Sequence, residues 1–316
     1  MSFRHEVDER HGLDQVSGDA FDLTIRRLGC EVIGLTWHHP EHGDIPLLWR
    51  NAQVEAPESG WKNHATILFP IVGGLHDMSS RTTDGTAVAF KRGHGFARES
   101  EFELIQAAGD EESFVLRYRL EASDKTMLFY PWRFRLEILY RLSATGLEQA
   151  ITVSNVDERP MPFQLGWHPG FNAPFLGGEK SACHLELPQG PAVRILNDER
   201  CFITGEKQVV DLTGDFDFTE EGLDRTYMFD LDGFVSFERR VVSLLDPDRR
   251  VGVRVHFGDY PQLGLWSDAD AGFICIEPWQ GMDDSVEQEP FDRKFGMVLL
   301  PALENDTRRA RIEVVG

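Results

Sequence analysis

The chain has 316 residues, of which 41% are hydrophobic and 27% charged, a balance typical of a globular protein with a sizeable core. Its 53 acidic residues outnumber 32 basic ones, and the formal net charge of -21 repels phosphate backbones and anionic lipids. Nucleic acids and membrane surfaces are therefore not expected partners, although a local arginine pocket could still hold one phosphate.

The N-terminal residues 1–14 are polar and charged, without the apolar run of a signal peptide. No apolar stretch approaches the roughly 20 residues that span a bilayer, so we expect a cytoplasmic protein. The four cysteines form no CxxC pair, which argues against a structural zinc site or a disulfide framework: Cys30, Cys183, Cys201 and Cys275. Cys275 lies in an apolar run and is expected to be a small buried hydrophobe.

Strand signals dominate the chain in sequence order. After short strands at residues 102–105 and 113–120, residues 134–142 alternate apolar and polar side chains, as a half-buried strand does. The alternation resumes at residues 147–153 after a turn, which predicts a β-hairpin. A second hairpin is predicted from residues 241–245 and 251–255, and two further strands at residues 234–238 and 273–276.

Helical periodicity is scarce, and the only helix expected is a short one near Asp284 to Glu289. Linkers, low-complexity segments and internal repeats are not apparent. Short strands separated by turns are typical of a sandwich or barrel. We therefore predict an all-β protein, a large antiparallel β-sandwich, in which residues 1–316 form a single domain.

Two histidines stand in unusual local sequence. His94 lies between Gly93 and Gly95, where the backbone can take uncommon dihedral angles and a ligand can approach closely; the alternative is a turn with a solvated histidine. His168 stands between Trp167 and Pro169, so it is expected to be partly buried on an extended backbone. Aromatic rings beside polar groups suit sugar binding. The alternative for His168 is a core histidine bonded to a backbone carbonyl.

Glu277 follows the apolar run 273–276 and precedes Pro278 and Trp279. Burial raises the pKa of a carboxyl group, which moves it toward the range of a general base. Pro278 is expected to end the strand because it lacks an N–H donor, and Trp279 to shield the site from water. The alternative is a strand-end glutamate turned to solvent.

Other constellations are weaker. His38, His39 and His42 could be drawn as a metal cluster, but the neighbouring Pro40 and Gly43 favour a surface turn. The glycine-rich nucleotide-binding motifs and the serine-hydrolase motif do not occur.

Four segments, in order and at the right spacing, resemble the aldose 1-epimerase (galactose mutarotase-like) family and its LacX-like subgroup. They are KRGHGFARESEFEL from Lys91, SNVDERPMPFQLGWHPGF from Ser154, YPQLGLWS from Tyr260 and FICIEPWQGMDD from Phe273. Together they span most of the chain, from about residue 68 to about residue 300. Each motif is modest alone, and four in order are specific.

The resemblance implies a supersandwich of antiparallel sheets with a cleft across one of them. It implies a sugar substrate, no metal, no organic cofactor, and a monomer or homodimer. Carried over residue by residue, Glu277 is the general base and His168 the general acid. His94 is a second sugar-binding histidine, and Asp224 resembles the family's hydroxyl-binding aspartate.

One departure concerns the stretch at residues 68–75, where the family often has an arginine at the position of Gly74. Arg81, Arg92 or Arg98 is expected to take over its sugar contact. We place Arg98 among the substrate-binding residues, together with Trp279.

Anomer exchange opens the pyranose ring: a base removes the C1 hydroxyl proton while an acid protonates the ring oxygen. The two groups are therefore expected on opposite sides of the C1–O5 unit. Three other functions stay open. They are a hexose-6-phosphate epimerase, which needs an arginine cluster at one end of the cleft, a non-catalytic sugar-binding protein, and a glycosidase. The last is disfavoured because Asp283 and Asp284 resemble surface turn residues.

Overall fold

The computed structural model describes residues 3–216, 226–268 and 271–316, in which antiparallel strands predominate. The chain begins with a five-stranded meander in which each strand pairs with the next. Its strands are β1 (Arg4–Asp8), β2 (Leu13–Ser17), β3 (Phe21–Arg26), β4 (Glu31–His39) and β5 (Gly43–Pro46).

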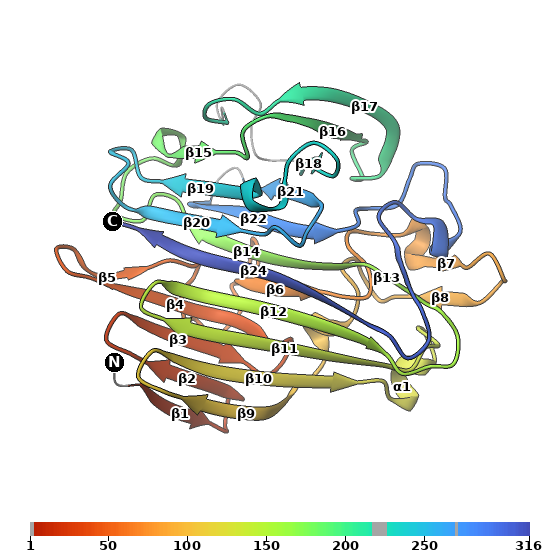
Figure 1. Cartoon of the computed structure of the whole chain (residues 1–316), viewed down its shortest axis with the longest axis horizontal. Coiled ribbons are helices and arrows are strands. Elements are labelled where there is room, and N and C mark those ends of the chain that lie inside the picture. Colours follow the sequence, from red (N-terminus) through yellow and green to blue (C-terminus); the bar gives the residue numbers. More distant parts are fainter. Residues whose placement is uncertain (1–2, 217–225, 269–270) are drawn as a thin grey trace.

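An eight-stranded sheet crosses the molecule, with the C-terminal strand β24 between β20 and β12 (Figure 1). Its strands, in spatial order, are β15 (His184–Glu186), β19 (Val241–Leu245), β20 (Gly252–His256), β24 (Asn305–Val315), β12 (Gly146–Asn155), β11 (Phe134–Ser143), β10 (Ser113–Glu121) and β9 (Glu103–Gly109). The C-terminal strand β24 thus joins β9–β12 to β19 and β20 in one sheet.

A seven-stranded sheet forms the other large layer. Its strands, in spatial order, are β17 (Ile203–Asp211), β16 (Pro191–Asn197), β18 (Tyr227–Asp230), β21 (Gln262–Trp266), β22 (Phe273–Gln280), β14 (Leu165–Asn172) and β6 (Ala65–Leu68). Two small sheets pair β7 (Ser79–Arg81) with β8 (Ala87–Ala89) and β13 (Met161–Phe163) with β23 (Val298–Leu300).

Helical structure in the described residues is confined to single turns. They are α1 (Asp124–Met127), η1 (His76–Met78), η2 (Ala97–Glu99), η3 (Lys180–Ala182), η4 (Phe237–Arg239) and η5 (Phe291–Arg293). None is long and apolar enough to cross a membrane. The helix expected near Asp284 to Glu289 is wrong, because this segment runs beside β17. The N–H of Ile203 bonds to the Asp284 carbonyl at 2.8 Å, and the N–H of Val286 to the Ile203 carbonyl at 2.8 Å.

The predicted all-β sandwich is confirmed, and so are both predicted hairpins, as β11–β12 and β19–β20. The predicted strand at residues 234–238 is wrong. There the N–H groups of Phe234 and Val235 both bond to the Leu231 carbonyl, which turns the chain into η4. The buried Arg240 side chain holds this turn by donating to the carbonyls of Val235 and Tyr260.

One continuous core fills the space between the large sheets, and it follows from the period of two along each strand. The eight-stranded sheet contributes residues such as Leu136 and Ile151, and the seven-stranded sheet contributes Trp167, Ile274 and Ile276. The alternate residues of β14 and β22 therefore face away from this core. His168 and Glu277 are among them.

Candidate active site

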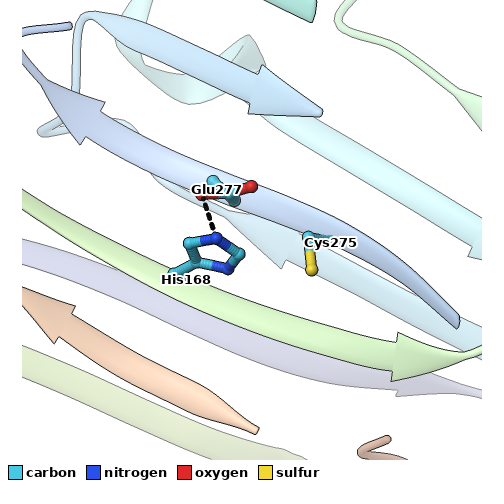
Figure 2. Close-up of side chains that lie close together, drawn as sticks. All are labelled: His168, Cys275 and Glu277. Carbon is cyan, nitrogen blue, oxygen red and sulfur yellow. Dashed lines mark ion pairs between the residues drawn. The ribbon is translucent and has the colours of Figure 1, made fainter. Parts of the chain in front are cut away.

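His168 and Glu277 stand opposite each other on adjacent strands of the seven-stranded sheet. The register pairs Gly166 with Trp279 and Gly170 with Cys275, so His168 lies midway, across from Glu277. Opposed residues on one face of a strand pair bring their side chains into contact. The Nε2 of His168 is 3.1 Å from Oε2 of Glu277, and the two residues are only 7% and 1% exposed. Figure 2 marks this ion pair with a dashed line.

Prolines flank this pair on both strands without ending either one. Pro169 follows His168 within β14, and Pro278 follows Glu277 within β22, which continues to Gln280. The expectation that Pro278 ends the strand is therefore wrong. The strands β14 and β22 pair on both sides of the two prolines, and β21 pairs with β22 in an unbroken register. Each proline therefore removes one backbone hydrogen-bond donor without ending its strand.

A cavity of about 550 Å³ opens over this pair. Five of the six residues predicted for the site line it: His94, Arg98, His168, Glu277 and Trp279. The sixth, Asp224, lies outside the described residues. Another hollow of about 580 Å³ lies on the eight-stranded sheet, but there the charged side chains pair with one another, as Arg309 does with Asp259.

His94 enters the cavity from a strained turn. Its φ of 65° and the φ of 71° at Gly95 are left-handed, as expected for a histidine between glycines. A Cβ on Gly95 would lie 2.2 Å from the carbonyl oxygen of Phe69, so only glycine fits there. The N–H of Gly73 donates to Nδ1 of His94 at 3.1 Å, which leaves Nε2 of the neutral ring as a hydrogen-bond donor.

Indole rings wall the cavity and rest on glycines of the strands. Trp61 stacks on His168 with ring centroids 5.0 Å apart and meets Trp266 edge-on at 5.8 Å. A Cβ on Gly170 would lie 2.4 Å from the Trp61 ring, and a Cβ on Gly264 would lie 2.7 Å from the Trp279 ring. The missing side chains therefore make room for the aromatic walls.

Comparison with known proteins assigns the chain to a family. A family model described as aldose 1-epimerase matches residues 16–308, which is most of the sequence. The chain belongs to the aldose 1-epimerase family. Two curated relatives, the chromosomal and plasmid LacX proteins of Lactococcus lactis subsp. lactis, are each 30% identical over 257 residues, 77% of this chain and 81% of theirs.

Solved structures agree with the assignment to the aldose 1-epimerase family. A galactose mutarotase related enzyme from Lactobacillus acidophilus superposes with a TM-score of 0.84 at 25% identity, over 96% of this chain and 97% of the other. A galactose mutarotase-like protein from Lactobacillus casei ATCC 334 has a TM-score of 0.80 at 23% identity, over 96% and 100%. The galactose 1-epimerase of Lactobacillus acidophilus NCFM shares the fold, with a TM-score of 0.70 at 13% identity over 99% and 98%.

Burial dominates the electrostatics of this family member's site. Burial raises the pKa of Glu277 well above its usual range, and the negative charge of Asp283 adds to the effect. Burial, and then the charge of Arg98, lowers the pKa of His168 to about 3. Burial and the neighbouring His168 also lower the pKa of His94 well below 6.5. The burial of these side chains therefore favours neutral imidazoles and a protonated Glu277.

Asp283 is a second carboxylate of the cavity, and the expectation that Asp283 and Asp284 are surface turn residues is wrong. Both are buried. Oδ1 of Asp283 accepts a hydrogen bond from the N–H of Gly74 at 2.7 Å, and burial raises its pKa to about 6. Nearby Lys294 is buried too. Its ammonium donates to Gln164 and to the carbonyls of Val72 and Met282.

A Cβ at Gly74 would lie 3.3 Å from the Met78 methyl group, so an arginine at this position would require that side chain to shift by a few tenths of an ångström. Of the three arginines considered as replacements, Arg92 and Arg98 line the cavity. Arg81 instead donates to the carbonyl of Gly85 in an exposed turn.

The sequence reasoning missed Trp61, Asp283 and the site role of Trp266. Trp61 could have been recognised from the sequence, since it is the only aromatic residue in the polar stretch 50–63. Of the histidines proposed for a surface turn, His38 pairs with Asp22 and Asp44, whereas His39 is buried beside Trp37.

Proposed function

We propose that this protein is an aldose 1-epimerase that interconverts the α and β anomers of a free hexose without a cofactor. The observation that carries the proposal is the buried contact of 3.1 Å between His168 and Glu277 in an indole-walled cavity. An imidazole and a carboxylate side by side can give and take the two protons that ring opening moves. The membership in the aldose 1-epimerase family supports this reading.

The geometry refines the expected mechanism. His168 and Glu277 are neighbours on one sheet face, so in this proposal the acid and the base reach the C1–O5 unit from the same sheet. The hydroxyl oxygen on C1 and the ring oxygen are bonded to the same carbon and lie close together. A carboxylate and an imidazole 3.1 Å apart can therefore each contact one of them at ordinary hydrogen-bond length.

Ring opening moves one proton onto Glu277 and one from His168, and ring closure reverses both transfers. Ring opening starts with a Glu277 carboxylate and a protonated His168: Glu277 takes the C1 hydroxyl proton while His168 protonates the ring oxygen. The open sugar rotates about C1–C2 and recloses with both transfers reversed. The 3.1 Å contact between the two side chains lets the proton of a resting, protonated Glu277 pass to His168, which gives this starting form.

The remaining polar atoms of the site fit a polyhydroxylated ligand. Nδ1 of His168 and Nε of Arg98 are buried without a hydrogen-bond partner among the described residues, and the 3.1 Å contact of Oε2 of Glu277 with Nε2 of His168 is not a hydrogen bond. A buried group left unpaired costs about 1–3 kcal/mol, which the hydroxyl groups of a bound sugar can offset. His94 adds a donor through Nε2, and the indole rings suit the C–H faces of a pyranose.

The decisive test is Glu277→Gln, which keeps the shape of the side chain and removes its basicity. We expect the rate of anomer exchange, measured by exchange spectroscopy of the anomeric protons, to fall about 100-fold or more, the usual contribution of a general base. Sugar affinity should change little, because the amide still hydrogen-bonds a hydroxyl. Glu103→Gln, an exposed glutamate on β9, is the matched control.

Two outcomes would decide against this proposal. If Glu277→Gln exchanges anomers at the unmodified rate, Glu277 is not the base. If the unmodified protein binds sugars but accelerates exchange for none of a panel of aldoses, a non-catalytic sugar-binding protein takes the place of the enzyme.

A hexose-6-phosphate is the second candidate substrate, because cations gather at the cavity of an otherwise acidic protein. Lys62, Arg92, Arg98 and Arg200 line it. Arg92 and Arg200 pair with Glu99 and Asp198, whereas Arg98 and Lys62 are in no ion pair within the described part of the chain.

Comparing exchange on glucose and galactose with exchange on their 6-phosphates separates the two substrates. If the phosphate is bound, Arg98→Met should lower kcat/KM on the phosphosugar about 10- to 100-fold, since a hydrogen bond to a charged group contributes about 1.5–3 kcal/mol. The rate on the free sugar should fall much less. Equal losses on both would show that Arg98 holds the sugar ring and not a phosphate.

A further inference from the structure

A thiol completes a three-donor cluster at the base of the cavity. Cys275 precedes Glu277 by two residues on β22, so both side chains project from the same face of the sheet. Donor atoms of His168, Cys275 and Glu277 all lie within 4.8 Å of one another, and Figure 2 shows the three side chains converging from the two strands. The proposed epimerase mechanism has no use for this thiol.

This donor set is the one that a thiophilic divalent cation takes. Zinc binds sulfur at about 2.3 Å and nitrogen or oxygen at about 2.0–2.2 Å, commonly through three protein ligands and one water. One donor pair of the cluster is already 3.1 Å apart, so small side-chain movements bring all three donors around one ion. Magnesium and calcium prefer oxygen donors alone and are poor matches for a thiolate.

A second observation points to a ligand at the same place. Nδ1 of His168 is buried and has no hydrogen-bond partner among residues 3–216, 226–268 and 271–316, and the buried Oε2 of Glu277 contacts Nε2 of His168 at 3.1 Å without a hydrogen bond. His168 and Glu277 also line the cavity, whereas Cys275 is not one of its lining residues. An ion held by the three would therefore keep one coordination position open toward the cavity for a water molecule.

We propose that this centre binds a thiophilic divalent cation such as Zn²⁺, and that the bound ion blocks anomer exchange. The inhibition rests on the proposed function, because the ion occupies the lone pairs with which His168 and Glu277 move protons. On binding, Cys275 forms a metal–sulfur bond and releases its thiol proton to solvent, as does Glu277 where it is protonated. No atom is oxidised or reduced.

The experiment measures both binding and inhibition. Zn²⁺ should inhibit exchange in competition with sugar, and Mg²⁺ should not. Cys275→Ala should retain exchange within a few-fold and raise the Zn²⁺ inhibition constant about 100-fold, since even the indirect partners of metal ligands contribute 10- to 100-fold to affinity. Cys201→Ala is the matched control, because Cys201 also lines the cavity but lies outside the cluster.

Cobalt gives a readout that does not depend on activity. Co²⁺ added to the unmodified protein and to Cys201→Ala should produce a thiolate-to-cobalt charge-transfer band, which Cys275→Ala should lack. Cys275→Ser, closer in volume to cysteine, repeats the test if alanine lowers the melting temperature. The proposal is overturned if Cys275→Ala is inhibited as strongly as the unmodified protein, or if no charge-transfer band forms. A band without measurable exchange would contradict the epimerase assignment alone.

Discussion

The contact between His168 and Glu277 makes the two side chains one titrating unit. Burial lowers the pKa of the imidazole and raises that of the carboxyl group, so the pair holds one proton over a wide pH range. That single proton is what the proposed ring opening needs, whichever of the two residues holds it at rest. The pair loses activity when it takes up a second proton or gives up the first.

The pH profile of kcat/KM should therefore differ from that of an ordinary histidine enzyme. The acid limb belongs to the second proton, on His168, whose pKa lies at about 3. Exchange above the uncatalysed background should thus stay nearly constant from about pH 6.5, where an unperturbed histidine titrates, down to about pH 5. The rate should fall on the alkaline side, as the raised pKa of Glu277 is passed. An acid limb centred at the usual histidine pKa would refute this coupling.

At the level of single residues, Glu277, the proposed general base, is the site residue that the sequence predicts best. Glu277 follows an apolar run and precedes a tryptophan, and both features predict burial. His94 and His168 were less certain from the residues alone, since a histidine beside glycine or tryptophan also suits a turn or a core. Asp283 could not be found, because its burial comes from the pairing of residues 284–286 with Ile203, a contact between distant segments.

On the scale of strands, the site depends on glycines that hold no side chain over the sheet. Gly170 gives the Trp61 ring its seat beside His168. The strands themselves were predictable wherever apolar and polar residues alternate, as in β11 and β12. Fully buried strands such as β14 do not alternate visibly in hydrophobicity, so their faces could be assigned only from the three-dimensional register.

Gly170→Ala should displace Trp61 without unfolding the protein, because the added Cβ would lie 2.4 Å from the indole ring. We expect a change in tryptophan fluorescence and about a 10-fold or greater loss in kcat/KM, since small misplacements in a site can cost up to 100-fold. Gly272→Ala, whose Cβ would meet its nearest neighbour at 3.7 Å, is the control. Full activity of Gly170→Ala would mean that Trp61 has no part in the site.

Across the whole molecule, charge is the least balanced property. With a net charge of -21, the excess carboxylates repel one another and destabilise the folded chain. Many exposed ion pairs, such as that of Arg135 with Glu121, act in the opposite direction. Exposed pairs contribute only about 0–1 kcal/mol each, so the repulsion should dominate.

Salt should therefore raise the melting temperature by a few degrees, because a Debye length of about 10 Å at 0.1 M screens the repulsion between distant carboxylates. Scanning calorimetry at low and high sodium chloride measures the effect. Sodium sulfate is avoided, since it also strengthens hydrophobic burial. A melting temperature that falls with added chloride would show that local ion pairs outweigh the net charge.

The opposition of His168 and Glu277 across β14 and β22 makes the spacing of the pair a property of the sheet. Adjacent strands lie about 4.8 Å apart in any β-sheet, so the reacting groups are set by backbone hydrogen bonds and not by a loop. Changes in loops such as residues 50–63 and 91–99 would therefore alter the walls of the cavity and leave the spacing of the proposed acid–base pair as it is. For protein engineering, two antiparallel strands with a histidine facing a glutamate are a transplantable unit, and a designed sheet that buries this pair under an indole is a direct way to build the chemistry anew.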